Sequence, residues 1–301
     1  MKKASIPFLV LLLLLLMITA CTPKSEMATE GKLQITVSIL PEKFFVERIG
    51  GDRVMVNVMV GPGDDPHTYE PKPDQMAALS QSEIYFAIGV EFEKAWLERF
   101  ASANPHMKIV DLSAGIEKIT LSNPSDEQDK GDTSGETHAE HALDPHIWTS
   151  PEISKIISTR IAQELSSLDE KNAPFYQANL KMLLQEIEQL QKDIRLALES
   201  VDNRRFLVFH PAWGYFAREF GLQQIPIEVG GTEPSAGELA KIIDTAKKEN
   251  IHVVFAQPEF STTTADYIAQ EINGRVVLVS PLAENWLDNL RKVADSFKEN
   301  L

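Results

Sequence analysis

The segment from Pro174 to Leu198, which reads PFYQANLKMLLQEIEQLQKDIRLAL, decides how the rest of the chain is organised. Its apolar residues recur at spacings of three and four, which places them in one stripe along a single helix. The members of this stripe are Leu180, Leu183, Leu184, Ile187, Leu190, Ile194 and Leu198. At 1.5 Å per residue, the helix would be roughly 38 Å long. Both a coiled-coil dimer helix and a rigid spine between two lobes fit this pattern.

Short runs rich in Val, Ile and Phe lie on both sides of this segment and have the composition of strands. They cover residues 35–40, 54–60, 84–88 and 107–112 before it, and residues 206–209, 225–229, 253–256 and 276–279 after it. Many show no alternation of apolar and polar residues, which is typical of parallel strands covered on both faces. Because four runs fall on each side of the segment, we favour the spine over the coiled coil.

Start signals for helices lie between these runs. Ser235 and Glu238 match a capping box, and Ser150 is a candidate N-cap. A proline stands at or near the expected first turn of four segments, where its missing N–H costs nothing: Pro41, Pro73, Pro151 and Pro174. This alternation predicts an α/β fold with two Rossmann-like lobes, each a parallel sheet flanked by helices, joined by one long rigid helix. We place the N-terminal lobe at 32–170, the linking helix at 171–202 and the C-terminal lobe at 203–301.

The first residues have the pattern of a targeting segment. Lys2 and Lys3 precede an apolar run at 8–17, which is shorter than the roughly twenty residues that a membrane-spanning helix needs. Ile-Thr-Ala-Cys follows at 18–21, and Cys21 is the only cysteine of the chain. An ordinary secretory signal or an N-terminal membrane anchor is the alternative, but the position of Cys21 favours a lipoprotein signal. The segment resembles a bacterial lipobox, which implies cleavage before Cys21 and acylation of its thiol. We therefore expect a signal at 1–21 and a polar tether at 22–31.

The charge of the chain restricts its partners. With 29 basic and 44 acidic residues the formal net charge is −15, which argues against nucleic acid as a partner. Six of the acids lie at 121–143, a stretch with almost no apolar residues that we expect to be a flexible surface loop. It also contains His138 and His141. A loose metal site and a solvated linker are equal alternatives for these two histidines.

Three histidines are candidate metal ligands because of the rigid sequence around them. We expect His67, His146 and His210 in loops directly after strands, where ligands bind in open α/β sheets. Each stands beside a proline, in the segments GPGDDPHTYEPKP (61–73), DPHIW (144–148) and FHPAWGYF (209–216). A rigid backbone and bulky apolar walls orient metal ligands and control access of water. Neutral imidazole suits Zn, Cu, Ni and Fe better than Mg or Ca. Structural histidines, hydrogen-bonded at rigid turns, are the alternative.

Other chemical signatures are weaker or missing from the sequence. We expect His106 in a loop after Asn104-Pro105, and His252 opens a strand with no evident partner. Asp64 and Asp65 have the pattern of solvated turn residues. The chain has no GxSxG elbow, no Walker loop and no GxGxxG motif after a strand. We therefore predict a binding protein rather than an enzyme.

Five segments in order resemble one family, the cluster A metal-binding solute-binding proteins of bacterial ABC transporters. This family comprises the zinc- and manganese-uptake lipoproteins, and the resemblance runs from about residue 35 to residue 297. The segments are the stretch at 63–73, DPHIW at 144–148, HPAWGYF at 210–216, TEPS at 232–235 and PLAENWLDNL at 281–290.

The resemblance implies a metal in the cleft between two α/β lobes, with His67 and His146 from the N-terminal lobe and His210 from the C-terminal lobe. Manganese members tend to place a carboxylate at the third position, so His210 favours Zn²⁺ as the captured ion, with Mn²⁺ as the alternative. The family often supplies a fourth, carboxylate ligand just before the Pro-Leu at 281–282, where this chain has Ser280. Three histidines with a water, or with a borrowed nearby acid, both remain open.

The resemblance also implies where the protein works and with which partners. We expect a monomer outside the cytoplasm that delivers its ion to an ABC permease. Its anchor would be acylated Cys21, in the periplasm or on the outer face of the cell membrane. A manganese or iron receptor of the same architecture, a zinc hydrolase and a metal-stabilised adhesion lipoprotein are the alternatives.

Overall fold

The computed structural model describes residues 31–121, 143–228 and 231–301. The predicted signal with Cys21, nearly all of the tether, and the loop that carries His138 and His141 lie outside these ranges. Residues 33–301 form one compact unit. No helix in the described ranges is both long and apolar enough to cross a membrane.

The N-terminal half contains a four-stranded parallel sheet with the strand order β2-β1-β3-β4. The strands are β1 (Leu33–Val37), β2 (Val54–Val58), β3 (Ile84–Ala87) and β4 (Lys108–Asp111). Its helices are α2 (Leu40–Gly50), α3 (Pro73–Leu79) and α4 (Glu93–Ala103), with a 3-10 turn η1 (Gly51–Arg53). The apolar runs of β1 and β3 are buried on both faces, as expected for central strands of a covered parallel sheet.

The C-terminal half repeats this topology, with the strand order β6-β5-β7-β8. The strands are β5 (Arg205–Val208), β6 (Gln223–Pro226), β7 (Val253–Ala256) and β8 (Arg275–Leu278). The helices are α7 (Gly214–Phe220), α8 (Ala236–Lys248), α9 (Thr263–Glu271) and α10 (Trp286–Asn300). In each sheet the strand order reverses beside the first strand of that half, β1 or β5, and the crevice beyond such a point is where ligands bind.

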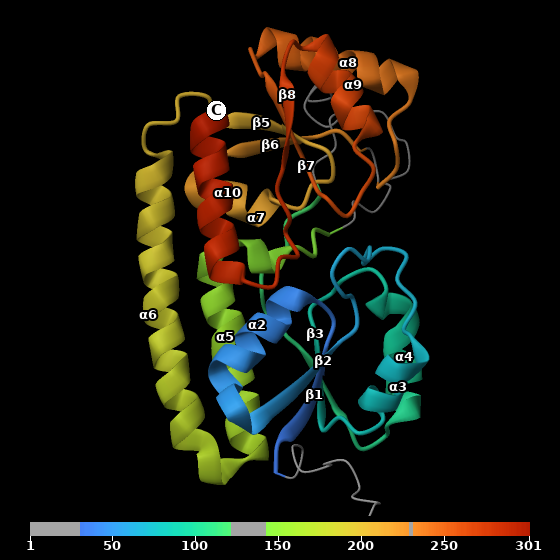
Figure 1. Cartoon of the computed structure of the whole chain (residues 1–301), viewed down its shortest axis with the longest axis vertical. Helices are drawn as coiled ribbons and strands as arrows, with labels where there is room; N and C mark the ends of the chain where they lie inside the picture. The colour runs from blue at the N-terminus through green and yellow to red at the C-terminus, as the bar shows by residue number, and fades with distance from the viewer. Residues whose placement is uncertain (1–30, 122–142, 229–230) are drawn as a thin grey trace, which may run out of the picture. The chain divides into compact units, whose positions relative to one another are not determined.

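The long helix α6 (Ala173–Leu198) lies against both halves of the chain (Figure 1). It packs against α2 and α5 (Pro151–Leu168), which precede it in the sequence, and against α7 and α10, which follow it. Six of the seven stripe residues are buried, and Leu184 is partly buried against the core. The stripe is therefore covered by the chain itself, which confirms the spine and the two-lobe α/β fold.

The eight strand-like runs correspond to the eight strands, with ends shifted by at most three residues, and the run at 253–256 coincides with β7. At the end of β1 the run was predicted too long, because Leu40 already belongs to α2, with Pro41 in its first turn. The predicted caps are present: Ser150 Oγ accepts from Ile153 N at 3.2 Å, and Ser235 N donates to Glu238 Oε2 at 2.8 Å.

Candidate metal centre

Three predicted histidines meet through the Nε2 atoms of their rings: His67, His146 and His210. They are separated by 79 and 64 residues in the sequence. His210 Nε2 lies 3.3 Å from His67 Nε2 and 3.3 Å from His146 Nε2. His146 and His210 are only 6% and 5% exposed. The structure therefore brings the three predicted histidines together, with His210 in the middle.

His67 is held by a turn between β2 and α3. Its backbone N donates to Asp65 Oδ1 at 2.9 Å, and Thr68 Oγ1 donates to the other oxygen of the same carboxylate at 3.2 Å. Pro66 is buried, whereas His67 itself is exposed at the mouth of the site. Desolvation of the ring and repulsion from His210 lower the pKa of His67, which keeps its imidazole neutral and ready to bind a metal.

His146 is oriented by the buried carboxylate of Asp144. Asp144 Oδ1 accepts from both the backbone N of His146, at 2.8 Å, and its ring Nδ1, at 2.7 Å. The expectation that His146 directly follows a strand was wrong. Within the described ranges the preceding strand is β4, which ends at Asp111, and His146 leads into a 3-10 turn η2 (Ile147–Thr149) ahead of α5.

His210 lies just beyond the carboxyl end of β5, as predicted. Its Nδ1 is 2.7 Å from Glu228 Oε2, and its backbone carbonyl accepts from Gln257 Nε2 at 2.7 Å. Glu228 comes two residues after Pro226, and His210 two residues after Val208, the Cα partner of Pro226 in the β5–β6 ladder. The carboxylate of Glu228 therefore reaches the His210 ring because the segments after β5 and β6 continue side by side past the strand ends.

The carboxylates fix which ring nitrogens face the centre of the site. The carboxylates of Asp144 and Glu228 accept hydrogen bonds from the Nδ1–H groups of His146 and His210. We therefore assign both rings the tautomer with a lone pair on Nε2. Two lone pairs cannot hydrogen-bond to each other, so the 3.3 Å contact between these Nε2 atoms is not a hydrogen bond but a spacing of two potential metal ligands. Nitrogens that bind one tetrahedral zinc at about 2.0–2.1 Å are themselves about 3.3–3.4 Å apart.

The three Nε2 atoms do not yet surround a single metal position. Among the described residues, no group of three or more His, Cys, Asp or Glu side chains already surrounds a metal position. The donor atoms are at coordination spacing as two pairs that share His210. Because His67 is the exposed member, it has the most freedom to complete the set.

The histidines open onto a cavity of about 20 Å³, enough for a single water or ion. Apolar groups form much of its wall, and Phe260 lies 5.3 Å from the His210 ring, centroid to centroid. Two carboxylates, Glu91 and Glu259, also line the cavity. It is therefore a small site with largely apolar walls and with imidazole and carboxylate groups that can bind a metal.

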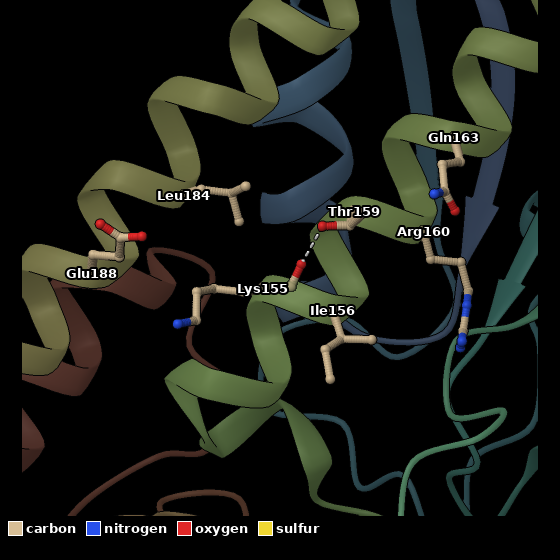
Figure 2. Close-up of a pocket in the computed structure, with 7 residues that line it drawn as sticks. All are labelled: Lys155, Ile156, Thr159, Arg160, Gln163, Leu184 and Glu188. Carbon is tan, nitrogen blue, oxygen red and sulfur yellow. Dashed lines mark hydrogen bonds between the residues drawn. The ribbon is translucent and has the colours of Figure 1, made fainter.

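A larger hollow of about 400 Å³ lies elsewhere, between α5 and α6 (Figure 2). Three of its polar groups, on Lys155, Thr159 and Arg160, already have partners within the protein. Thr159 Oγ1 donates to the carbonyl of Lys155 at 2.7 Å, and Arg160 Nη1 donates to the Leu112 carbonyl at 2.7 Å. Nothing in this hollow resembles the convergent donors of the histidine site.

The remaining predicted residues have structural roles. Asp64 and Asp65 stabilise turns, as expected, since Asp64 Oδ2 accepts from Gly61 N and Lys72 Nζ. His252 has a partner that the sequence did not reveal, because its Nδ1 is 2.9 Å from the Ile272 carbonyl. Sequence reasoning gave no role to Asp144, although it stands in a quoted motif, and it missed Glu228 and Glu259. Acids next to strand ends would have been the signal for the latter two.

Comparison with known proteins gives a consistent result. The family model "Zinc-uptake complex component A periplasmic" (ZnuA) matches residues 35–300. The high-affinity zinc uptake system protein ZnuA of Bacillus subtilis is 27% identical over 304 residues, covering 95% of this chain and 94% of the relative. The zinc-binding lipoprotein AdcA of Streptococcus pneumoniae is 25% identical, covering 99% of this chain and 61% of the relative. A crystal structure of ZnuA superposes with a TM-score of 0.81 at 45% identity, covering 89% of this chain and 99% of that one. The chain belongs to the ZnuA family of zinc-uptake components.

Proposed function

We propose that this protein is an extracytoplasmic receptor that captures Zn²⁺ between its lobes and delivers it to an ABC permease. The observation that carries the proposal is the convergence of three imidazole Nε2 atoms, with the Nδ1 atoms of His146 and His210 held by carboxylates. The ion is cargo, so the site has to bind it tightly and still release it.

The donor set favours zinc by its chemistry. Three neutral imidazoles are borderline donors, which suit Zn²⁺ better than the oxygen-preferring Mn²⁺. Asp144 and Glu228 raise the basicity of the rings and hold them in place, so little ordering is needed on binding. His67, at the exposed edge, is the natural ligand to engage last and leave first. Capture and release through His67 would then need only a small movement.

Titration calorimetry tests the proposal. We expect metal-stripped protein to bind one Zn²⁺ tightly and Mn²⁺ weakly, and His210→Ala to lose the tight zinc site. His106→Ala, which changes an exposed histidine on the loop before β4, is the matched control and should bind like the unsubstituted protein. Unchanged zinc affinity in His210→Ala would refute the site, and tight Mn²⁺ with weak Zn²⁺ would reverse the choice of metal.

We further propose that Cys21 anchors the protein to a membrane after cleavage just before it, which removes residues 1–20. The pattern at 18–21 supports this, as does the word lipoprotein in the name of the AdcA relative. Multiple acyl chains on one residue would give stable attachment. Cys21→Ser should move the protein from the membrane fraction of the producing cells to the soluble fraction. Retention of Cys21→Ser with the membranes would contradict the anchor.

We also propose that residues 32–170 and 203–301 form the two lobes and that residues 171–202 form the rigid connection between them. We propose a monomer without enzymatic activity, since the carboxylates that contact His146 and His210 are occupied in orienting them.

A further inference from the structure

One carboxylate in the cavity has an oxygen that no protein group satisfies. Glu259 follows β7 and lines the same cavity as the three histidines. Ser280 Oγ donates a hydrogen bond to its Oε1. Its Oε2 is buried and has no hydrogen-bond partner among the described residues. A buried, unpaired carboxylate oxygen is costly unless it is paired or binds a cation.

Ser280 determines the direction in which Glu259 points. The backbone N of Leu282 donates to Ser280 Oγ at 3.1 Å, so the hydroxyl proton is left for Glu259 Oε1. The serine hydroxyl therefore holds Glu259 in place through its only proton. Register explains why the two residues meet: Ala256 of β7 is the Cα partner of Leu278 of β8, and Glu259 and Ser280 follow within three residues.

The other carboxylates near the histidines do not offer a buried free oxygen to the cavity. Asp144 and Glu228 accept from His146 Nδ1 and His210 Nδ1. Asp144 Oδ2 is also buried without a hydrogen-bond partner among the described residues, but Asp144 is not one of the residues that line the cavity. Glu91 also lines the cavity, but its side chain is 52% exposed and Glu91 Oε1 pairs with Lys94 Nζ at 3.2 Å. Glu259 is the one lining acid with a buried free oxygen in the described part of the chain.

We propose that Glu259 Oε2 supplies the fourth ligand to the captured ion, and that Ser280 is the positioning residue that aims it. The inference rests on the proposed function and adds the residue that closes the three-histidine set. Three imidazoles and one carboxylate complete a tetrahedral zinc shell without water. The carboxylate also offsets one of the two charges that the ion brings into a site with apolar walls.

The test compares Glu259→Gln with Glu91→Gln, the matched change in the other acid of the cavity. We expect Glu259→Gln to raise the Kd for Zn²⁺ at least about tenfold, by analogy with the loss of groups that orient or complete a metal shell. Glu91→Gln should leave the Kd within about twofold, as expected for an exposed, solvent-screened carboxylate. The visible spectrum of the Co²⁺-loaded protein, which reports the number and kind of ligands, should change only for Glu259→Gln. Equal zinc affinities and superimposable Co²⁺ spectra for Glu259→Gln, Glu91→Gln and the unsubstituted protein would overturn the inference.

Ser280 provides a second test that keeps Glu259 in place. Ser280→Ala should weaken zinc binding and shift the Co²⁺ spectrum, whereas Ser280→Thr, which retains the hydroxyl, should restore both. If Glu259→Gln does not fold, as judged by thermal unfolding of the metal-free protein, the Ser280 pair decides. Zinc affinity and spectra that are unaffected by Ser280→Ala would contradict the positioning role. Failure of the proposed function is distinguishable, because the unsubstituted protein itself would then bind no zinc.

Discussion

Trp286 Nε1 donates a hydrogen bond of 2.8 Å to the backbone carbonyl of Trp148, and both side chains are 1% exposed. Trp148 Nε1 in turn donates to the carbonyl of Pro281, also at 2.8 Å. Trp148 follows His146 by two residues, and Pro281 follows Ser280 directly. This chain of two hydrogen bonds ties the segment of His146, from the N-terminal half, to the segment of Ser280, from the C-terminal half. The ligand geometry and the joint between the lobes thus share the same buried groups.

Trp286→Phe tests how far the joint supports the site. The change removes one of two donors to Trp148 O, which keeps Ser154 Oγ at 3.1 Å, while an aromatic ring can still pack against Phe45, 5.0 Å away centroid to centroid. We expect the free energy of unfolding of the metal-free protein to fall by about 0.5–1.5 kcal/mol, the usual contribution of one hydrogen bond, and zinc affinity to fall with it. Urea unfolding measures the first and calorimetry the second. Trp96→Phe, on the partly buried face of α4, is the control. Equal losses in both variants would show that the hydrogen bond has no special role.

Gly214→Ala should damage the site through Asp144. A Cβ at position 214 would lie 2.6 Å from Asp144 Oδ2, the carboxylate that holds His146, and 2.9 Å from Ile119 Cδ1. Because α7 begins at Gly214 against this buried wall, the carboxylate has to move and His146 loses its orientation. We expect zinc affinity to fall by about 10- to 100-fold, the range for loss of a group that orients a metal ligand.

Gly237→Ala is the matched control for that substitution. Gly237 lies in the first turn of α8, and nothing stands within 4 Å of a Cβ there. Alanine has the higher helix propensity, so this variant should be as stable as the unsubstituted protein or slightly more stable, with unchanged zinc affinity. Similar affinity losses for the two glycine variants would contradict the proposed clash with Asp144.

The buried carboxyl of Glu42 predicts a specific dependence of stability on pH. Desolvation, followed by repulsion from Glu93, raises the pKa of Glu42 well above its ordinary value of 4.5. The unfolded chain therefore loses this proton at lower pH than the folded protein does. Stability falls as the pH rises from about 4.5 to the raised pKa, with a slope of at most about 1.4 kcal/mol per pH unit for one proton.

Glu42→Gln should remove this contribution. The amide oxygen can still accept from Ser38 N and Ile39 N, which donate to Glu42 Oε2 at 2.9 and 3.0 Å. We expect the stability of the variant relative to the unsubstituted protein to increase with pH above 4.5. Urea unfolding of both metal-free proteins at several pH values measures the difference, in which titrating groups that do not interact with Glu42 largely cancel. A difference that does not change with pH would contradict the raised pKa.

Local signals made the fold and the three histidines predictable. The stripe of α6, the prolines in first helical turns and the capping box at Ser235 each act within a few residues, so the sequence alone reveals them. Prolines beside His67, His146 and His210 marked rigid loops in the same way. Glu228 and Glu259 enter the site only because β6 pairs with β5 and β7 with β8 in particular registers. Strand register depends on long-range packing, which one sequence does not display.

The pairing of Glu228 with His210 predicts different outcomes for two substitutions of that glutamate. Glu228→Gln keeps an oxygen that can accept from His210 Nδ1, so we expect only a small loss of zinc affinity. Glu228→Ala removes the acceptor, frees the ring to rotate and lowers its basicity, which should raise the Kd by about 10- to 100-fold. Glu170→Ala, at an exposed position ahead of α6, controls for the loss of one negative charge. Calorimetric titration of the three variants separates orientation from charge: equal losses for Glu228→Gln and Glu228→Ala would mean that the carboxylate acts by its charge rather than by holding the ring.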